Sequence, residues 1–176
     1  TITAAADTGL FNGGGTSTIT IPNGTLLDPT GDGLGAGAAA ADVVIGTGGV
    51  YYATAGSPDN NIDLAGGTLS VGPAERFYEG DITVSANSTI NARENNSSTT
   101  TDEGRNIRFT GNVTGTGSLT ILGETDANNN GLVMFDTNPV AGTGADTSQF
   151  SGALILEQGE VRYDEFGWNG ANDFQT

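Results

Sequence analysis

Carboxylates and amides are the side chains with which this sequence could do chemistry. The 176 residues include 21 Asp and Glu against five Lys and Arg, all five of them arginine, with no His and no Cys. Without an imidazole there is no His-containing triad, and without Lys there is no Ser–Lys variant of it. The missing thiols also exclude disulfides and cysteine-ligated zinc.

Paired acids are the remaining catalytic option, because two carboxylates can together cleave a glycosidic bond. Adjacent acids occur at Asp102-Glu103 and at Asp164-Glu165. Neighbouring residues of a strand point to opposite faces, so neither pair would converge on one substrate. We therefore expect solvated surface acids, no catalytic residues and no enzymatic activity.

One segment has the beginning of a calcium-binding loop. Asp126, Asn128 and Asn130 offer oxygen ligands at alternate positions, and Gly131 follows where an EF-hand loop turns sharply. The bidentate acid expected six positions after the glycine is replaced by Thr137. Two interpretations stay open, an Asn-rich turn with no cofactor and a calcium site.

Five Asn-x-Ser/Thr sequons could accept N-linked glycans. A chain this rich in Asn, Ser and Thr also produces such triplets by chance, so a bare surface is the alternative. The polar segment 95–98 is the most accessible of these places. The acceptors are Asn23, Asn87, Asn95, Asn96 and Asn112.

Arginines lie close to aromatic residues at two places, which is a grouping that can bind sugar through stacking and hydrogen bonds. Arg76 precedes Phe77 and Tyr78, and Arg105 and Arg108 lie on either side of the start of an expected strand. The alternative is that these arginines form ion pairs with the abundant acids.

The formal net charge of −16 predicts which partners the surface avoids. Such a surface repels phosphate backbones and anionic lipid, so we expect no nucleic-acid partner. Segment 34–56 is mostly Ala and Gly with Asp42 among them, so we expect no membrane insertion. The chain starts at Thr1 without an apolar leader, so we expect any signal peptide to have been removed. The missing Cys, taken together with the richness in Gly, Thr and Asn, predicts a secreted bacterial protein, extracellular or at the cell surface.

Short alternating strands must position these side chains. Apolar and polar residues alternate along most of the chain, as at 18–21, 68–71 and 118–121, which is the signature of half-buried strands. Between them lie turn residues, many of them among the 29 glycines. The sequence therefore predicts an all-β fold.

The spacing of the strand groups favours one all-β architecture. The first apolar residues of successive groups recur at a near-constant step, which is typical of stacked rungs of about 20–25 residues. One rung cannot bury its own inward side chains, but its neighbours cover them. We expect a parallel β-solenoid (β-helix), with a β-sandwich or jelly roll as the alternative. The anchors are Ile62, Ile82, Ile107, Leu132 and Leu154, and the inward set is Ile82, Ile107, Leu119, Leu154 and Val161.

Two polar or small-residue segments interrupt the pattern. Residues 28–42 are expected to form an excursion, and 91–105 a solvated loop between rungs. Strand patterns continue on both sides of each, so the sequence predicts a single domain over 1–176. Within it, 1–60 form atypical first rungs or a cap, 61–163 form regular rungs, and 164–176 form an aromatic tail.

From 109 to 163 the chain resembles a known family. The stretch FTGNVTGTGSLTILG (109–123), then FSGALIL (150–156) and QGEV (158–161), is similar to the autotransporter-associated β-strand repeat. The matching positions are Gly115, Gly117, Leu119, Thr120, Phe150, Gly152, Gly159 and Val161. This resemblance implies a right-handed parallel β-helix used as a stalk or passenger on cell surfaces, without catalytic residues.

The expected function is that of a non-catalytic structural protein of an extracellular fibre, sheath or surface stalk. Its partners would be further copies of itself, joined head to tail, or adjoining repeats. Two alternatives are an adhesin or module binding surface polysaccharide through Tyr51, Tyr52, Phe77, Tyr78 and Trp168, and, less favoured, a polysaccharide lyase. For assembly we expect the aromatic residues of the tail to meet the N-terminal strand of the next copy. These residues are Phe166, Trp168, Phe174, Ile19 and Ile21.

Overall fold

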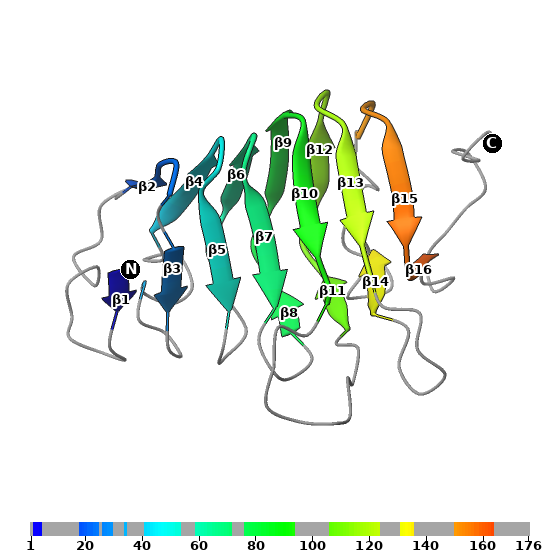
Figure 1. Ribbon diagram of the computed structural model, residues 1–176, viewed down its shortest axis with the longest axis horizontal. Coiled ribbons are helices and arrows are strands. Elements are labelled where there is room, and N and C mark those ends of the chain that lie inside the picture. The colour runs from blue at the N-terminus through cyan, green and yellow to red at the C-terminus, as the bar shows by residue number, and fades with distance from the viewer. Residues whose placement is uncertain are drawn as a thin grey trace, which may run out of the picture.

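The protein is built from strands that form three parallel sheets, as seen in a computed structural model (Figure 1). The structure describes residues 2–4, 18–24, 26–29, 34, 41–53, 59–71, 76–93, 106–123, 131–135 and 150–163. Within these ranges there is no helix, and every ladder between named strands is parallel. The expected all-β class is therefore confirmed. The antiparallel pairing of a sandwich or jelly roll is not found among these ladders.

The sixteen strands are divided among sheets that we name A, B and C. Sheet A holds β1 (Ile2–Ala4), β3 (Leu26–Pro29), β5 (Val50–Ala53), β7 (Thr68–Val71), β10 (Ser88–Asn91), β13 (Leu119–Leu122) and β15 (Leu154–Gln158). Sheet B holds β2 (Thr18–Ile21), β4 (Asp42–Gly46), β6 (Ile62–Ala65), β9 (Ile82–Ala86) and β12 (Val113–Gly115). Sheet C holds β8 (Arg76–Tyr78), β11 (Ile107–Phe109), β14 (Leu132–Phe135) and β16 (Glu160–Tyr163).

The chain visits the sheets in a repeating order. From β6 to β14 it passes from sheet B to sheet A to sheet C three times, and we call each such passage a circuit. Each circuit lays its strands beside those of the previous one, so β6, β9 and β12 are neighbours in sheet B. The turn from sheet B to sheet A is always short, and a single residue, Asn87, separates β9 from β10.

The core lies between the sheets and is built from columns of like side chains. Period-2 alternation turns every second residue inward, and the parallel register stacks these residues on one another. In sheet B, Val43, Ile62 and Ile82 form one such column, all at most 1% exposed. Of the predicted inward residues, Ile82, Ile107 and Leu119 are buried, whereas Leu154 and Val161 are partly buried against the core.

Aromatic rings form the column of sheet C. Tyr78, Phe109 and Phe135 occupy one register position on three neighbouring strands, with ring centroids 5.5 and 5.4 Å apart. Tyr51 of sheet A meets Tyr78 edge to face at 6.4 Å. Such pairs stabilise a core beyond their area burial, by about 0.5–1.5 kcal/mol each. Tyr51 and Tyr78 are fully buried, so the expectation that both are exposed binding aromatics is wrong.

The regular step inferred from the five anchors is partly wrong. Ile62 and Ile82 are neighbours in sheet B, but Ile107 lies in sheet C and Leu154 in sheet A. The anchors therefore compare positions in different sheets. Measured within sheet B, contacts between successive circuits span 19, 20 and 31 residues.

The two expected interruptions are only partly described. Asp28 and Pro29 belong to β3, and Asp42 opens β4, so the segment 28–42 has strands at both ends. Of 91–105, Asn91 ends β10, and Ala92 and Arg93 follow it, with Ala92 buried. The remainder of both segments lies outside the described residues, apart from the buried Leu34 and Ala41.

Candidate functional site

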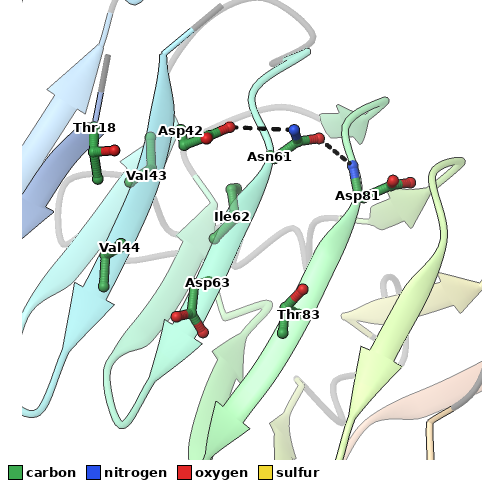
Figure 2. A pocket seen from close by; sticks show the side chains of 9 residues that line it. All are labelled: Thr18, Asp42, Val43, Val44, Asn61, Ile62, Asp63, Asp81 and Thr83. Carbon is green, nitrogen blue, oxygen red and sulfur yellow. Dashed lines mark hydrogen bonds between the residues drawn. The ribbon is translucent and has the colours of Figure 1, made fainter. Parts of the chain in front are cut away.

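An open groove with polar and apolar lining runs across the outer face of sheet B, with a volume of about 370 Å³ (Figure 2). It is lined by residues of β2, β4 and β6, by Asp81 just before β9 and by Thr83 within it, so four neighbouring strands of sheet B contribute to it. Val43 and Ile62 also line it, although both residues are buried in the core. The side chains that give the groove its polar character are Thr18, Asp42, Asn61, Asp63, Asp81 and Thr83.

A ladder of alternating Asp and Asn follows the upstream end of these strands. Asn61 Nδ2 donates to Asp42 Oδ1 at 3.2 Å, and the Asp81 backbone N–H donates to Asn61 Oδ1 at 3.1 Å (Figure 2). Asp81 Oδ1 in turn accepts from the backbone N–H and from Nδ2 of Asn112, at 2.9 and 3.1 Å. We call Asp42, Asn61, Asp81 and Asn112 the Asx ladder.

The alternation has an electrostatic reason. Neighbouring strands lie about 4.8 Å apart, so an Asp on every circuit would place like charges opposite one another. Asn61 between Asp42 and Asp81 doubles that separation and supplies a donor to one carboxylate. The ladder therefore links successive circuits while it keeps its charges apart.

Asp63, the third acid of the groove, also accepts a hydrogen bond from a residue of the neighbouring strand. Ser85 Oγ donates to Asp63 Oδ1 at 2.5 Å, and Asp63 is paired in register with Thr83. The strand register and these hydrogen bonds thus hold the side chains of Asp42, Asp63 and Asp81 on the outer face of sheet B. The arrangement suits hydrogen bonding to a polar ligand, and it presents the negative charge that the composition predicts.

Metal-binding geometry is not found within the described ranges, where no group of three or more Asp and Glu side chains converges. Asp126, Asn128 and Asn130 lie outside those ranges, so the calcium interpretation stays a prediction. The described chain likewise contains no helix long and apolar enough to cross a membrane.

Three of the five sequon asparagines are described. Asn23 lies exposed in the turn after β2. Asn87 is exposed in the turn between β9 and β10, and its Oδ1 accepts from the Ser118 N–H at 2.9 Å. Asn112 belongs to the Asx ladder. Asn95 and Asn96 lie outside the described residues, and glycosylation stays a prediction.

An Arg–aromatic pair is present on the outer face of sheet C, but it joins one residue from each of the two expected groupings. The Arg108 guanidinium lies 5.7 Å from the centre of the Phe77 ring, and the two residues are in register on β11 and β8. Arg162, in the same column two strands further on, is held by Glu160 at 2.6 Å. That carboxylate raises the pKa of Arg162. Arg105 lies outside the described residues.

Two of the five expected assembly residues, Ile19 and Ile21, are described, and both lie on β2. β2 is the last strand of sheet B on its side; there Ile21 is buried, and Ile19 is partly buried against the core. The side chains of Ile19 and Ile21 therefore expose little apolar surface, and what β2 offers to a partner is mainly its backbone edge. Phe166, Trp168 and Phe174 lie outside the described residues.

Sequence reasoning missed the Asx ladder and the exposed strand β15. Ile155 and Leu156 of β15 are 44% and 50% exposed, the exposed large hydrophobic residues of the described chain. A signal for the ladder was present, because an Asp or Asn directly precedes the first apolar residue in DVVI, NIDL, DITV and NVTG. No comparable signal exists for β15, whose sequence LILEQ reads like any buried strand.

In comparisons with known proteins, no family model, no curated protein and no solved structure matches this chain.

Proposed function

We propose that this chain is a non-catalytic structural protein, a right-handed parallel β-solenoid that joins end to end into an extracellular fibre, sheath or stalk. The fold part of the proposal is supported by the three circuits from sheet B to A to C and by the side-chain columns that cross them. Parallel strands joined by crossovers are nearly always connected with a right hand, which favours the right-handed coil.

One observation carries the structural role. The core is a set of side-chain columns, and among the described strands one column of sheet A ends at β15 in the half-exposed Leu156. An open parallel edge over apolar side chains is a template for another chain. Contact between two different surfaces repeats without closing, so copies joined in this way form a filament.

The chemistry of the outer faces fits a structural role better than catalysis. Asp42, Asp63 and Asp81 each accept a hydrogen bond from a residue of a neighbouring strand or turn, and these contacts repeat along the sheet. The groove is an open surface that does not exclude water, whereas catalytic carboxylates work in pairs at a fixed separation around a substrate.

Electron microscopy and sedimentation velocity of the purified full chain test this proposal. We expect filaments whose mean length grows with protein concentration. Deletion of residues 164–176 tests the expected contribution of Phe166, Trp168 and Phe174 and should shorten or abolish them. A full chain that stays monomeric across the concentration range contradicts the proposal.

Carbohydrate binding is the second candidate, and the stacking of Arg108 on Phe77 is the observation that favours it. An aromatic ring beside a guanidinium can hold a sugar ring and its hydroxyls. A glycan array should then show binding that Phe77→Ala removes. Binding that survives this substitution would move the site to another face, and an array without signal would remove the candidate.

A further inference from the structure

The outer face of sheet C carries a column in which apolar and cationic side chains alternate. The parallel register places Phe77 of β8, Arg108 of β11, Met134 of β14 and Arg162 of β16 side by side. The inward residues next to them along the strands pack in the core, so these four side chains face outward. We call the four residues the Arg column.

The Arg column concentrates positive charge on an acidic protein. The chain has a formal charge of −16, and its five basic residues are all arginine. Three arginine side chains are described; Arg93 donates hydrogen bonds to two later circuits, whereas Arg108 and Arg162 both belong to the Arg column. Among the described side chains on the strands of sheet C, Glu160 is the one acid. This described face therefore has a positive balance of charge.

The groove of sheet B has the opposite charge at the same spacing. In the Asx ladder, Asp42 and Asp81 are separated by one strand position, which Asn61 occupies. Arg108 and Arg162 are likewise separated by one strand of sheet C. Neighbouring strands lie about 4.8 Å apart, so both pairs of charges are about 9.6 Å apart along their columns. The two faces are thus complementary in charge and in period.

The two faces also differ in shape in a complementary way. The groove of sheet B is an open hollow of about 370 Å³, in which Asp42, Asn61 and Asp81 form one row (Figure 2). The Arg column presents long side chains, and that of Arg162 is 58% exposed. Glu160 engages Nε and one Nη of Arg162. A guanidinium has five N–H donors, so Arg162 can bind a second carboxylate as well.

We propose that the Arg column of one copy docks into the sheet B groove of a second copy lying beside it. Arg108 and Arg162 then face Asp42 and Asp81. The occupant is another copy of this chain, because its groove supplies carboxylates at the spacing of the two arginines. The inference rests on the end-to-end assembly proposed above, since it explains how the resulting filaments join side by side into a fibre or sheath.

The middle residue of each column fixes the register of the contact. Met134 lies between the two arginines, and Asn61 lies between the two aspartates. Met134 therefore faces Asn61 whether the second copy points the same way along the column or the opposite way. Phe77, at the end of the Arg column, meets a polar position of sheet B in both cases, either Thr18 or Asn112.

Repetition along a filament gives this contact its strength. Exposed ion pairs are individually weak, and the net charge of each copy opposes association. A filament presents the same contact once per copy, and linked contacts bind far more strongly than separate ones. We therefore expect filaments to associate side by side, whereas separate chains do not.

Neutralising the two arginines tests the electrostatic part of the contact. Arg108→Gln combined with Arg162→Gln should leave single filaments and abolish their bundling in electron micrographs. Thr68→Glu combined with Thr120→Glu is the matched control, because it lowers the net charge by the same two units on the outward side of sheet A. The control should still form bundles. Bundles that survive the glutamine substitutions overturn the contact.

Chemical crosslinking tests which residues face each other. The native chain has no Cys, so filaments of Met134→Cys and of Asn61→Cys can be mixed and treated with a bis-maleimide about 10 Å long, the distance between sheets packed face to face. We expect mixed dimers from this pair. Thr89→Cys, on the outward side of sheet A, should give none when it replaces Asn61→Cys.

The outcomes distinguish this contact from the proposed function. A wild-type chain that never forms filaments overturns the proposed function, and this contact with it. Wild-type filaments that stay single overturn the contact alone, as do bundles without capture between positions 134 and 61. Single filaments that bind an acidic polysaccharide, with binding lost in the glutamine variant, would assign the Arg column to a glycan and also overturn the contact between copies.

Discussion

Close approach between backbones decides which residues the corners of this protein tolerate. At Gly117, in the turn from sheet B to sheet A, an added Cβ would lie 2.4 Å from the Ala86 carbonyl oxygen of the circuit before. At Gly46, at the end of β4, the nearest such atom is the Ile21 carbonyl oxygen at an ordinary 3.4 Å. The glycine content of the chain thus has a local cause, since stacked turns leave no room for a side chain at some positions.

These two glycines give a matched pair of variants. Gly117→Ala should lower the free energy of unfolding by about 1–3 kcal/mol, because the backbone of two circuits must move apart. Gly46→Ala should leave it unchanged or raise it slightly, because alanine restricts the unfolded chain. Thermal melts followed by circular dichroism measure both, and equal effects of the two substitutions would contradict the stacking of the turns.

Leu119 and Leu122 lie on the same strand but differ in burial, which allows a second comparison of matched variants. Leu119 is 1% exposed, whereas Leu122 of the same strand lies on the outward side and is only partly buried. Leu119→Asp should unfold the protein, because the core offers that charge no partner. Leu122→Asp should leave it folded with a lower melting temperature. Retention of native β-sheet circular dichroism by Leu119→Asp would contradict the assigned inward face.

At the scale of the strand, the parallel register stacks residues of successive strands into columns. The Asx ladder places Asp42, Asn61 and Asp81 on three neighbouring strands, so the chemistry at one position depends on residues about twenty positions away. In the same way the rings of Phe109 and Phe135 stack across β11 and β14. The residues of one column contact one another, so the effect of a substitution depends on the residues at the same register position of the neighbouring strands.

Charge in the Asx ladder predicts a salt-dependent stability. Asn61→Asp would bring three carboxylates onto consecutive strands and remove the donor to Asp42. Its melting temperature should fall at low ionic strength and recover partly with added salt, since salt screens exposed charges. Asn61→Ala, which removes the hydrogen bonds without adding charge, should show the loss without the salt recovery. Identical salt dependence in both variants would contradict the electrostatic role.

The strands themselves could be predicted more fully than their pairing. Alternation located the inward faces of Ile82, Ile107 and Leu119, because period 2 is a property of one strand alone. The pairing depends on how much chain lies between strands, and contacts in sheet B that span 19, 20 and then 31 residues defeat a constant step. For adjacent aromatics such as Tyr51 and Tyr52, alternation alone cannot select the inward one. The buried face of Tyr51 follows from its register with Leu69.

At the scale of the whole molecule, the net charge opposes association of copies, whereas the proposed edge-strand contact would favour it. A formal charge of −16 makes copies repel, while the exposed Ile155 and Leu156 of β15 would favour the proposed contact between copies. Repulsion acts over the Debye length, about 30 Å at 0.01 M salt and about 8 Å at 0.15 M. The contact itself acts only at close range and is less sensitive to salt.

End-to-end assembly should therefore depend on ionic strength in a definite direction. Raising NaCl from about 10 mM to about 150 mM should speed assembly and lower the concentration at which it starts, because screening removes the long-range repulsion. Light scattering of the full chain measures both. Filaments that dissolve on addition of salt would indicate that charge pairs, and not strand edges, hold the copies together.

The connections between the sheets differ in length, and this difference determines where the chain can accept an insertion. The turn from sheet B to sheet A never exceeds the four residues 22–25, whereas the connection from sheet A to sheet C grows from 72–75 to 92–106 in the next circuit. Foreign peptides spliced into the A-to-C corner should leave the stack intact, and the same peptides in the B-to-A corner should not. A polymer decorated in this way would carry its cargo in a single row, spaced by the length of one copy.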